Sequence, residues 1–256
     1  MPVLDEERHL AEAVEAILAQ HDPRAAEVVI AVGPSRDGTR EVADRLAASD
    51  PRVRVVANPS GRTPDGLNAA IADLSPDIDV VVRVDGHGVL DPGYIATALR
   101  LLEETGAANV GGLMDAEGIT PFERAVARAM TSRLGVGASA FHTGGVAGAV
   151  DTVYLGVFRK EWLDRMGGYS PRFTRAQDWE LNHRIREAGG LVWFSPELRV
   201  AYRPRPTLRA LARQYRDYGR WRRVVARQHA GTLNPRYLAP PAALVAIAAG
   251  AVGGFV

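Results

Sequence analysis

Short runs of β-branched residues alternate with amphipathic segments through the first 115 residues, and this alternation constrains the fold more than any other feature. The apolar runs predict buried strands at 27–33, 52–57, 79–85 and 108–114. The segments between them predict helices at 5–20, 39–48, 64–74 and 92–104. Strands and helices that alternate at this spacing favour an α/β fold with a mixed, mainly parallel sheet flanked by helices. In such sheets ligands bind at the carboxyl ends of the strands.

The composition excludes several kinds of chemistry. The chain has 256 residues, of which 46% are hydrophobic, so it can bury the core of one large domain. It contains no cysteine, which excludes disulfides, a thiolate nucleophile and a zinc–thiolate site. The formal net charge is +1, so we predict no nucleic-acid partner.

The last third of the chain differs from the rest in charge. A strand is predicted at 151–160 and helices at 176–190 and 208–229. Between residues 199 and 236 there are eleven arginines and one acidic residue, Asp217. The predicted organisation is a catalytic domain over residues 1–205, a basic amphipathic helix region over 206–236 and an apolar segment over 237–256.

The apolar segment 237–256 carries no charge over 20 residues, which is about the length that spans a bilayer. We expect it to be a transmembrane segment that continues past the end of the sequence; the alternative is a buried terminal helix. If it inserts, the preceding arginines favour the cytoplasmic side of the membrane for the rest of the chain. The predicted location is therefore the cytoplasmic face of the cell membrane.

One predicted strand ends in an unusual polar sequence. The segment "DVVVRVDGHGVLDP" runs from residue 79 to 92 and places Asp85 and His87 directly after a buried strand. One interpretation is a tight turn, because Asp and Gly commonly form turns. The other is a cation site that holds a diphosphate, since carboxylate and imidazole are both metal ligands.

Several motifs in order resemble the family 2 glycosyltransferases, which have the nucleotide-diphospho-sugar transferase fold called GT-A. The similarity is greatest to the exopolysaccharide branch, of the succinoglycan type, in which a membrane segment follows the catalytic domain. It covers most of residues 1–195. The motifs that carry the resemblance are "MPVLDEERHLAEAVEAIL", "GPSRDGT", "NPSGRTPDGLNAAI", "RVDGH", "VDTVYLGVFRKEWLDRMGGY" and "QDWELNHRIREAGG".

The resemblance implies a divalent cation at the donor diphosphate. "VDGH" stands where the family has DxD, so Asp85 is expected near the ribose and the metal, and His87 as a metal ligand. A cation neutralises the charge of the leaving diphosphate. Mn²⁺ or Mg²⁺ is expected, and the imidazole of His87 favours Mn²⁺ because Mg²⁺ prefers oxygen ligands.

The resemblance also implies a general base for the acceptor hydroxyl. The family's ED motif corresponds to Gln177 and Asp178, so Asp178 is the expected base, with Glu180 as the alternative on another face of the helix. Asp178 could instead cap the helix or pair with its dipole.

Recognition of the nucleotide is less clearly encoded, because Val32 and Gly33 replace the Asp pair that the family commonly has. The candidate contacts are then Pro2, Leu4, Asp5, Glu7, Asp37 and Arg62, in addition to Asp85. Asp37 is an equally good helix cap. On the acceptor side the candidates are His142, Asp151 and the "QYRDYGRW" motif with Gln214, Arg220 and Trp221. This motif is expected to bind a diphosphate or anionic headgroups, or else to form an amphipathic surface helix.

These features predict an inverting glycosyltransferase that moves a sugar from a nucleotide-sugar, with UDP-sugar the expected donor, to a hydroxyl of a lipid-linked or polysaccharide acceptor. The alternative is a membrane-associated nucleotide-sugar binding protein without catalysis. A dinucleotide-dependent dehydrogenase is disfavoured because no GxGxxG follows an early strand. Only four residues precede the first predicted helix, so we expect the native first strand to begin upstream.

Overall fold

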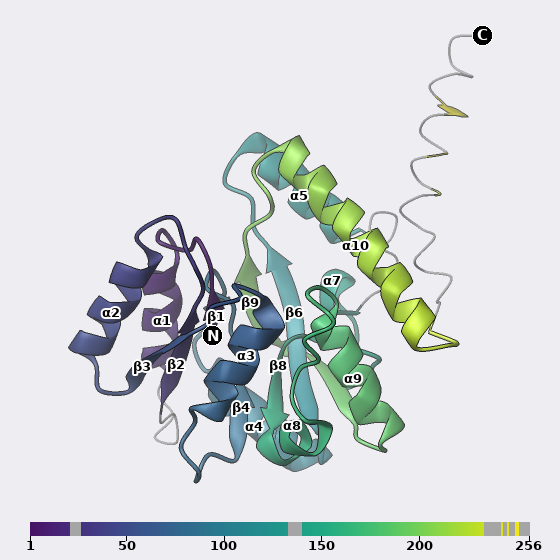
Figure 1. Ribbon diagram of the computed structural model, residues 1–256. Helices are drawn as coiled ribbons and strands as arrows, with labels where there is room; N and C mark the ends of the chain where they lie inside the picture. Colours follow the sequence, from purple (N-terminus) through teal and green to yellow (C-terminus); the bar gives the residue numbers. More distant parts are fainter. Residues whose placement is uncertain (21–26, 133–139, 233–241, 243–244, 246–248, 251–256) are drawn as a thin grey trace.

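The computed structural model describes residues 1–20, 27–132 and 140–232, together with positions 242, 245, 249 and 250. Within these residues, helices and strands alternate as expected of an α/β protein (Figure 1). The strands are β1 (Pro2–Val3), β2 (Val28–Val32), β3 (Val53–Ala57), β4 (Val80–Val82), β5 (Val89–Leu90), β6 (Asn109–Ala116), β7 (Gly148–Ala149), β8 (Tyr154–Arg159) and β9 (Val192–Tyr202). The helices are α1 (Leu10–Leu18), α2 (Thr39–Ser49), α3 (Thr63–Ala72), α4 (Tyr94–Thr105), α5 (Pro121–Met130), α7 (Ala140–Thr143), α8 (Lys160–Met166), α9 (Gln177–Glu187) and α10 (Leu208–Gln228).

The first sheet is parallel and has the order β1-β2-β3. Helices α1 and α2 lie on one side of it and α3 on the other (Figure 1). The central strand β2 is buried at all five positions, which explains its unbroken run of apolar residues. The prediction of parallel strands flanked by helices is confirmed for this part of the chain.

The second sheet is mostly antiparallel. Its order is β4-β8-β6-β9-β5, with β7 paired to β9, and the β6–β9 pair is parallel. The prediction of a mixed sheet is confirmed, whereas the expectation that it is mainly parallel is wrong. Strand β8 runs antiparallel to both of its neighbours, a direction that alternation along the sequence does not encode.

Strand β9 was not predicted from the sequence. It has 11 residues and contains Pro196, which normally argues against a strand because proline cannot donate to the ladder. The structure accommodates it at a register shift between Phe194, which pairs with Gly111, and Arg199, which pairs with Leu113. The break in the ladder lies at Pro196, so the two halves of β9 remain paired with β6.

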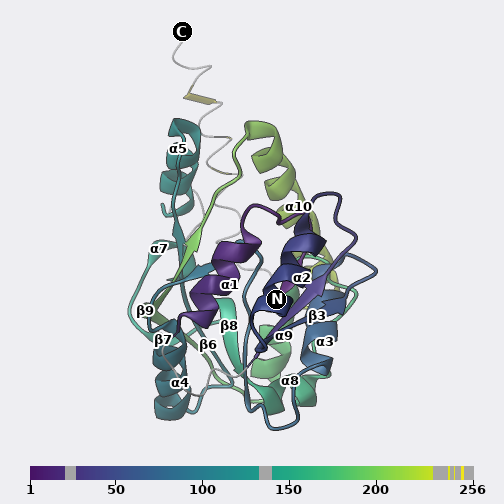
Figure 2. The ribbon, with the colours of Figure 1, turned by 90° about the vertical axis from the view of Figure 1, so that its left-hand side faces the viewer.

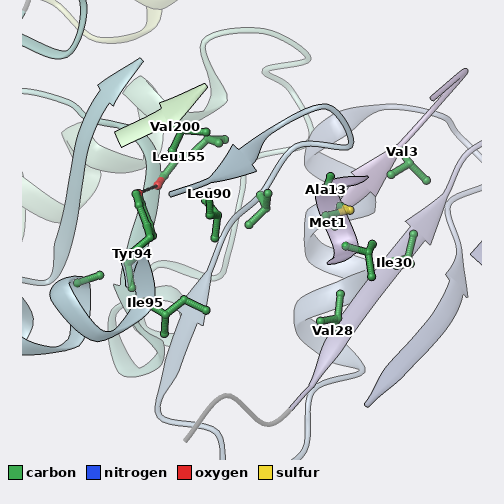
Figure 3. Packing of buried hydrophobic residues seen from close by; sticks show 14 of the residues in the cluster. Met1, Val3, Ala13, Val28, Ile30, Leu90, Tyr94, Ile95, Leu155 and Val200 are labelled. Atoms are coloured by element: carbon green, nitrogen blue, oxygen red, sulfur yellow. Dashed lines mark hydrogen bonds between the residues drawn. The ribbon is translucent and has the colours of Figure 1, made fainter. Parts of the chain in front are cut away.

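The largest core cluster joins the two sheets. It combines residues of the parallel sheet, such as Ile30, with residues of α4 and β9, such as Ile95 and Val200 (Figure 3). The buried Tyr94 hydroxyl donates to the carbonyl oxygen of Leu155 at 3.2 Å. Each fully buried valine or isoleucine side chain of this cluster stabilises the fold by about 1.5–3 kcal/mol. The core thus fixes the position of β8 relative to β1.

Two helices extend beyond the sheet. Strands β6 and β9 end side by side at the paired residues Ala116 and Tyr202. From these ends the chain continues into α5 and α10 (Figures 1 and 2). The predicted basic helix at 208–229 is confirmed as α10. No helix among the described residues is long and apolar enough to cross a membrane. The predicted segment 237–256 lies outside the described residues, except for four isolated positions.

Candidate active site

A cleft of about 1820 Å³ lies between the strand ends and α10. One wall comes from residues 2–87 and the other from residues 114–227. Six of the predicted site residues line it: Pro2, Leu4, Asp5, Asp85, His87 and Asp178. Asp85 and His87, which follow β4, and the expected base Asp178 therefore lie in the same cleft.

Arg83 binds the carboxylates of both Asp85 and Asp178. It is the first residue after β4 and is only 5% exposed, at the floor of the cleft. Its Nη2 donates to Asp85 at 2.9 Å, and its Nη1 donates to Asp178. A buried guanidinium that binds two carboxylates with separate nitrogens holds both in defined positions.

The charge of Arg83 also affects protonation. Burial by itself would raise the pKa of Asp85, but the charges of Arg83 and His87 and the hydrogen bond from Arg83 hold that pKa below its ordinary value. Asp85 is thus an anion at neutral pH. That is the form in which it can bind a cation.

His87 is oriented by a residue from the first turn of the chain. Its Nδ1 lies 2.7 Å from Oε1 of Glu6. Burial would lower the pKa of His87, but the hydrogen bond and the charge of Glu6, together with Asp85, raise it above its ordinary value. Gly86 is needed for this contact, because a Cβ there would lie 2.9 Å from Cγ of Glu6. The pairing leaves Nε2 as the ring nitrogen with no hydrogen bond among the described residues.

Asp178 is not a helix cap. Helix α9 has Ala176 at its N-cap, with φ of 59° and no side-chain capping bond, and Asp178 lies in the first turn. Its carboxylate is 29% exposed and faces Arg83 and the cleft. The capping alternative is therefore wrong, whereas the alternative that Asp178 pairs with the helix dipole stays open, because Asp178 lies in the first turn.

Glu180, the alternative base, serves a different purpose. It is 3% exposed, and both of its oxygens accept hydrogen bonds from Arg184 at 2.8 Å. The Arg184 guanidinium also donates to the carbonyl oxygens of Met166 and Gly168. Glu180 does not line the cleft, so it ties α9 to the end of α8.

Three of the predicted nucleotide contacts take part in hydrogen bonds that join residues 5–7 to residues 35–39. Asp5 Oδ1 accepts from the backbone N–H of Arg36 at 2.7 Å, and Glu7 Oε2 accepts from that of Gly38 at 3.1 Å. The Asp37 carboxylate in turn accepts from the backbone N–H groups of Glu7 and Thr39. These bonds explain why α1 begins at Leu10 and not at residue 5 as predicted.

The remaining nucleotide candidates are divided between the cleft and the surface. Pro2 and Leu4 line the cleft and Leu4 is 42% exposed, as a contact for a planar base requires. Arg62 is 48% exposed and pairs with Asp65 at 2.7 Å. Glu7, Asp37 and Arg62 are not among the lining residues. Their assignment as donor contacts stays a prediction.

The acceptor-side candidates are also divided. Gln214 and Trp221 line the cleft, and Gln214 donates to the hydroxyls of Tyr202 and Tyr218, which ties α10 to β9. Trp221 packs with Phe173 against the buried Val225. His142 lines the cleft as well, whereas Asp151 and Arg220 do not.

Among the charged residues of the cleft that were not predicted as site residues are Glu6, Arg83, Arg175 and Arg205. Burial raises the pKa of Tyr218 to about 12, and the charges of Arg175 and Arg205 oppose this rise. The charge of Arg205 likewise opposes the rise in the pKa of His87. The one signal for Arg83 was a charge within a run of valines, since a charged residue is rarely buried without a partner. The pairing of Glu6 with His87 spans 81 positions, and no local pattern reveals it.

Known proteins with similar sequences and folds are glycosyltransferases. The succinoglycan biosynthesis protein ExoA of Rhizobium meliloti (strain 1021) is 35% identical over 252 residues, 98% of this chain and 76% of that protein. The fold is similar to that of the mannosyltransferase PcManGT from Pyrobaculum calidifontis, solved with GDP-Man and Mn²⁺. The TM-score is 0.68 at 21% identity, covering 98% of this chain and 73% of that one.

A second structure with this fold is S. aureus TarS 1-349 in complex with UDP-GlcNAc. It has a TM-score of 0.58 at 15% identity, covering 80% of this chain and 58% of that one. These likenesses confirm the GT-A-like fold. The profile of Glycosyl transferase family 2 matches residues 1–186. This match favours the enzyme over the non-catalytic binding protein that was the alternative, and the chain belongs to glycosyl transferase family 2.

Proposed function

We propose that this enzyme is an inverting transferase that moves a sugar from a nucleotide-sugar, with a UDP-sugar as the expected donor, to a hydroxyl of a lipid-linked or polysaccharide acceptor. We further propose that it works at the cytoplasmic face of the membrane, anchored by residues 237–256. The similarity to a succinoglycan biosynthesis protein supports a polysaccharide product.

One observation carries the catalytic assignment: a single guanidinium, that of Arg83, binds both Asp85 and Asp178 inside the cleft. The residue expected at the donor diphosphate and the residue expected to act as base are therefore neighbours. A general base must lie close to the anomeric carbon, because it takes the proton from the acceptor oxygen that forms a bond to that carbon.

The reaction follows from this geometry. The acceptor hydroxyl oxygen forms a bond to the anomeric carbon from the side opposite the leaving group, and its proton passes to a carboxylate oxygen of Asp178. The bond from the anomeric carbon to the phosphate oxygen breaks, and its electron pair remains on the diphosphate. Arg83 donates a hydrogen bond to the Asp178 carboxylate and holds it at the cleft, where it can accept the proton.

The residues at the diphosphate fit a divalent cation that arrives with the donor. The described residues contain no group of three or more His, Asp or Glu side chains that could hold a metal alone. Asp85 and the Nε2 of His87 would supply two ligands. This number suits Mn²⁺ or Mg²⁺, which take further oxygens from substrate phosphates and water. Once bound, the cation would neutralise charge on the leaving diphosphate.

The decisive experiment is the substitution Asp178→Asn. Transfer should fall by about 10²–10⁴-fold, because the amide cannot accept the hydroxyl proton. The affinity for the donor, measured by calorimetry with a panel of nucleotide-sugars, should stay close to that of the native enzyme. Asp164→Asn, an exposed position paired with Lys160, is the matched control. Native turnover in Asp178→Asn would remove this residue from the mechanism.

Two further measurements test the remaining parts of the proposal. The anomeric configuration of the product should be opposite to that of the donor, and a retained configuration would overturn the inverting mechanism. A strong chelator should suppress transfer, with recovery on addition of Mn²⁺. An unchanged rate of transfer in the presence of the chelator would refute the cation site at Asp85 and His87.

A further inference from the structure

Helix α10 carries six arginines along one face. They recur at intervals of four and three residues, so at 3.6 residues per turn they form a single line about 27 Å long. We call this line the arginine stripe. Its members are Arg209, Arg213, Arg216, Arg220, Arg223 and Arg227.

The arginine stripe is exposed and has no partner within the described residues. All six side chains are exposed, and none makes an ion pair or hydrogen bond with the part of the chain that the structure describes. Some arginines elsewhere on the surface are paired: Arg40 pairs with Asp44 and Arg100 with Glu104. Asp217 is the one acidic residue of α10. Six unneutralised charges in a line favour an external anionic surface.

The opposite face of α10 is already used for packing. Val225 is fully buried, Trp221 packs on Phe173, and Leu211 joins the cluster formed by Met114 and Tyr202. The apolar face therefore cannot insert into a bilayer while α10 stays in place. Any membrane contact of this helix is electrostatic and made by the arginine stripe.

From these observations we infer that the arginine stripe binds the anionic headgroups of a membrane surface. An exposed helix face is convex and straight, so it suits a plane of charges better than a single polymer chain, which a groove would hold. The sequence after α10 continues into the uncharged residues 237–256, as expected beside a membrane. α10 lies on the outside of the molecule, at the end away from the β1-β2-β3 sheet (Figure 1).

This contact would also orient the cleft. Arg216, Arg223 and Arg227 line the cleft as well as the stripe, so the edge of the cleft and the headgroup plane would coincide. A lipid-linked acceptor could then reach Asp178 without leaving the bilayer. The inference rests on the proposed function only for this last step, since the stripe and its exposure are independent of catalysis.

The test uses the 256-residue chain and vesicles of phosphatidylcholine with or without phosphatidylglycerol. The native protein should partition preferentially onto the anionic vesicles, and 1 M salt should abolish this preference by screening. The variant combines Arg209→Gln, Arg213→Gln and Arg220→Gln, three stripe positions outside the cleft lining. Its partition onto anionic vesicles should be about 150-fold weaker, which corresponds to about 1 kcal/mol for each arginine.

A matched control removes the same charge elsewhere through Arg40→Gln, Arg52→Gln and Arg100→Gln, and it should partition like the native protein. Donor binding by calorimetry should be unchanged in both triple variants, so loss of membrane contact is distinguished from loss of the proposed function. A stripe variant that keeps the native preference for anionic vesicles would overturn the inference. So would a native protein that binds heparin tightly and shows no preference for anionic vesicles.

Discussion

The substitution Arg83→Gln tests the central feature of the site. It keeps a polar side chain of intermediate length but removes the charge that Asp85 and Asp178 share. Arg83 is only 5% exposed, and removal of one member of a buried ion pair costs about 3–5 kcal/mol. The two carboxylates are 22% and 29% exposed and can take up water from the cleft. We therefore expect a loss of about 3 kcal/mol in the free energy of unfolding at pH 7.

The pH dependence of this loss gives the sharper test. In the native protein the pKa of Asp85 is held low, so its stabilisation is present above the unfolded pKa of about 3.9 and is lost as the pH falls through the folded pKa. Without Arg83, burial raises the pKa of Asp85, and the penalty disappears as the carboxyl takes up a proton. The deficit of Arg83→Gln should thus shrink to roughly half or less near pH 4.

The assay is urea denaturation followed by tryptophan fluorescence and circular dichroism at pH 7 and pH 4. Arg83→Lys, which keeps the charge but cannot reach both carboxylates with two nitrogens, should lie between the native protein and Arg83→Gln. Arg40→Gln, at an exposed pair with Asp44, should behave like the native protein. A deficit of equal size at both pH values would refute this reasoning, because it would mean that Arg83 acts through packing and not through charge.

Three other substitutions probe separate contacts. Glu6→Gln should lower the free energy of unfolding by about 1 kcal/mol at pH 5.5 and by little at pH 8.5. The raised pKa of His87 means that this contact stabilises the fold below about pH 6.5, and the stabilisation is lost as the pH rises through the folded pKa. Equal losses at both pH values in urea denaturation would contradict this reasoning. Ala176→Gly should stabilise by about 0.5 kcal/mol, because φ of 59° suits glycine; a lower melting temperature in calorimetry contradicts this. Gly112→Ala should cost about 3 kcal/mol or more, because a Cβ there would overlap the carbonyl oxygen of Leu198; a native melting temperature would show that β6 and β9 separate easily.

Local sequence patterns were sufficient to predict several strands. The apolar runs predicted β2, β3 and β6, and the position of Asp85 at a strand end followed from them. Asp178 was predicted through a motif, and the structure brings it to the same cleft as Asp85. Its role in catalysis stays a prediction. Asp85 lies three residues after the end of β4, and Asp178 lies in the first turn of α9.

The interactions that were not predicted all depend on contacts between distant segments. Strand β9 was not predicted because it contains Pro196, and the register shift that accommodates this proline forms only when β9 pairs with β6. The side chains of Asp5 and Asp37 could bind either backbone or nucleotide, and the choice depends on how residues 5–7 lie against 35–39. Arg83 was overlooked for the same reason, since its two partners lie 2 and 95 positions away.

The division of the cleft between two stretches of chain has an evolutionary consequence. The wall from residues 2–87 contains Pro2, Leu4, Asp5 and Asp85 of the predicted donor contacts, and the wall from residues 114–227 contains residues of α5 and α10. Under the proposed function, mutations in the second stretch would change which acceptor fits while the first remains under selection for its nucleotide. Recombination between related genes near codon 100 would exchange one specificity and preserve the other. A lineage of such enzymes can therefore diversify its polymers without having to evolve a new donor site.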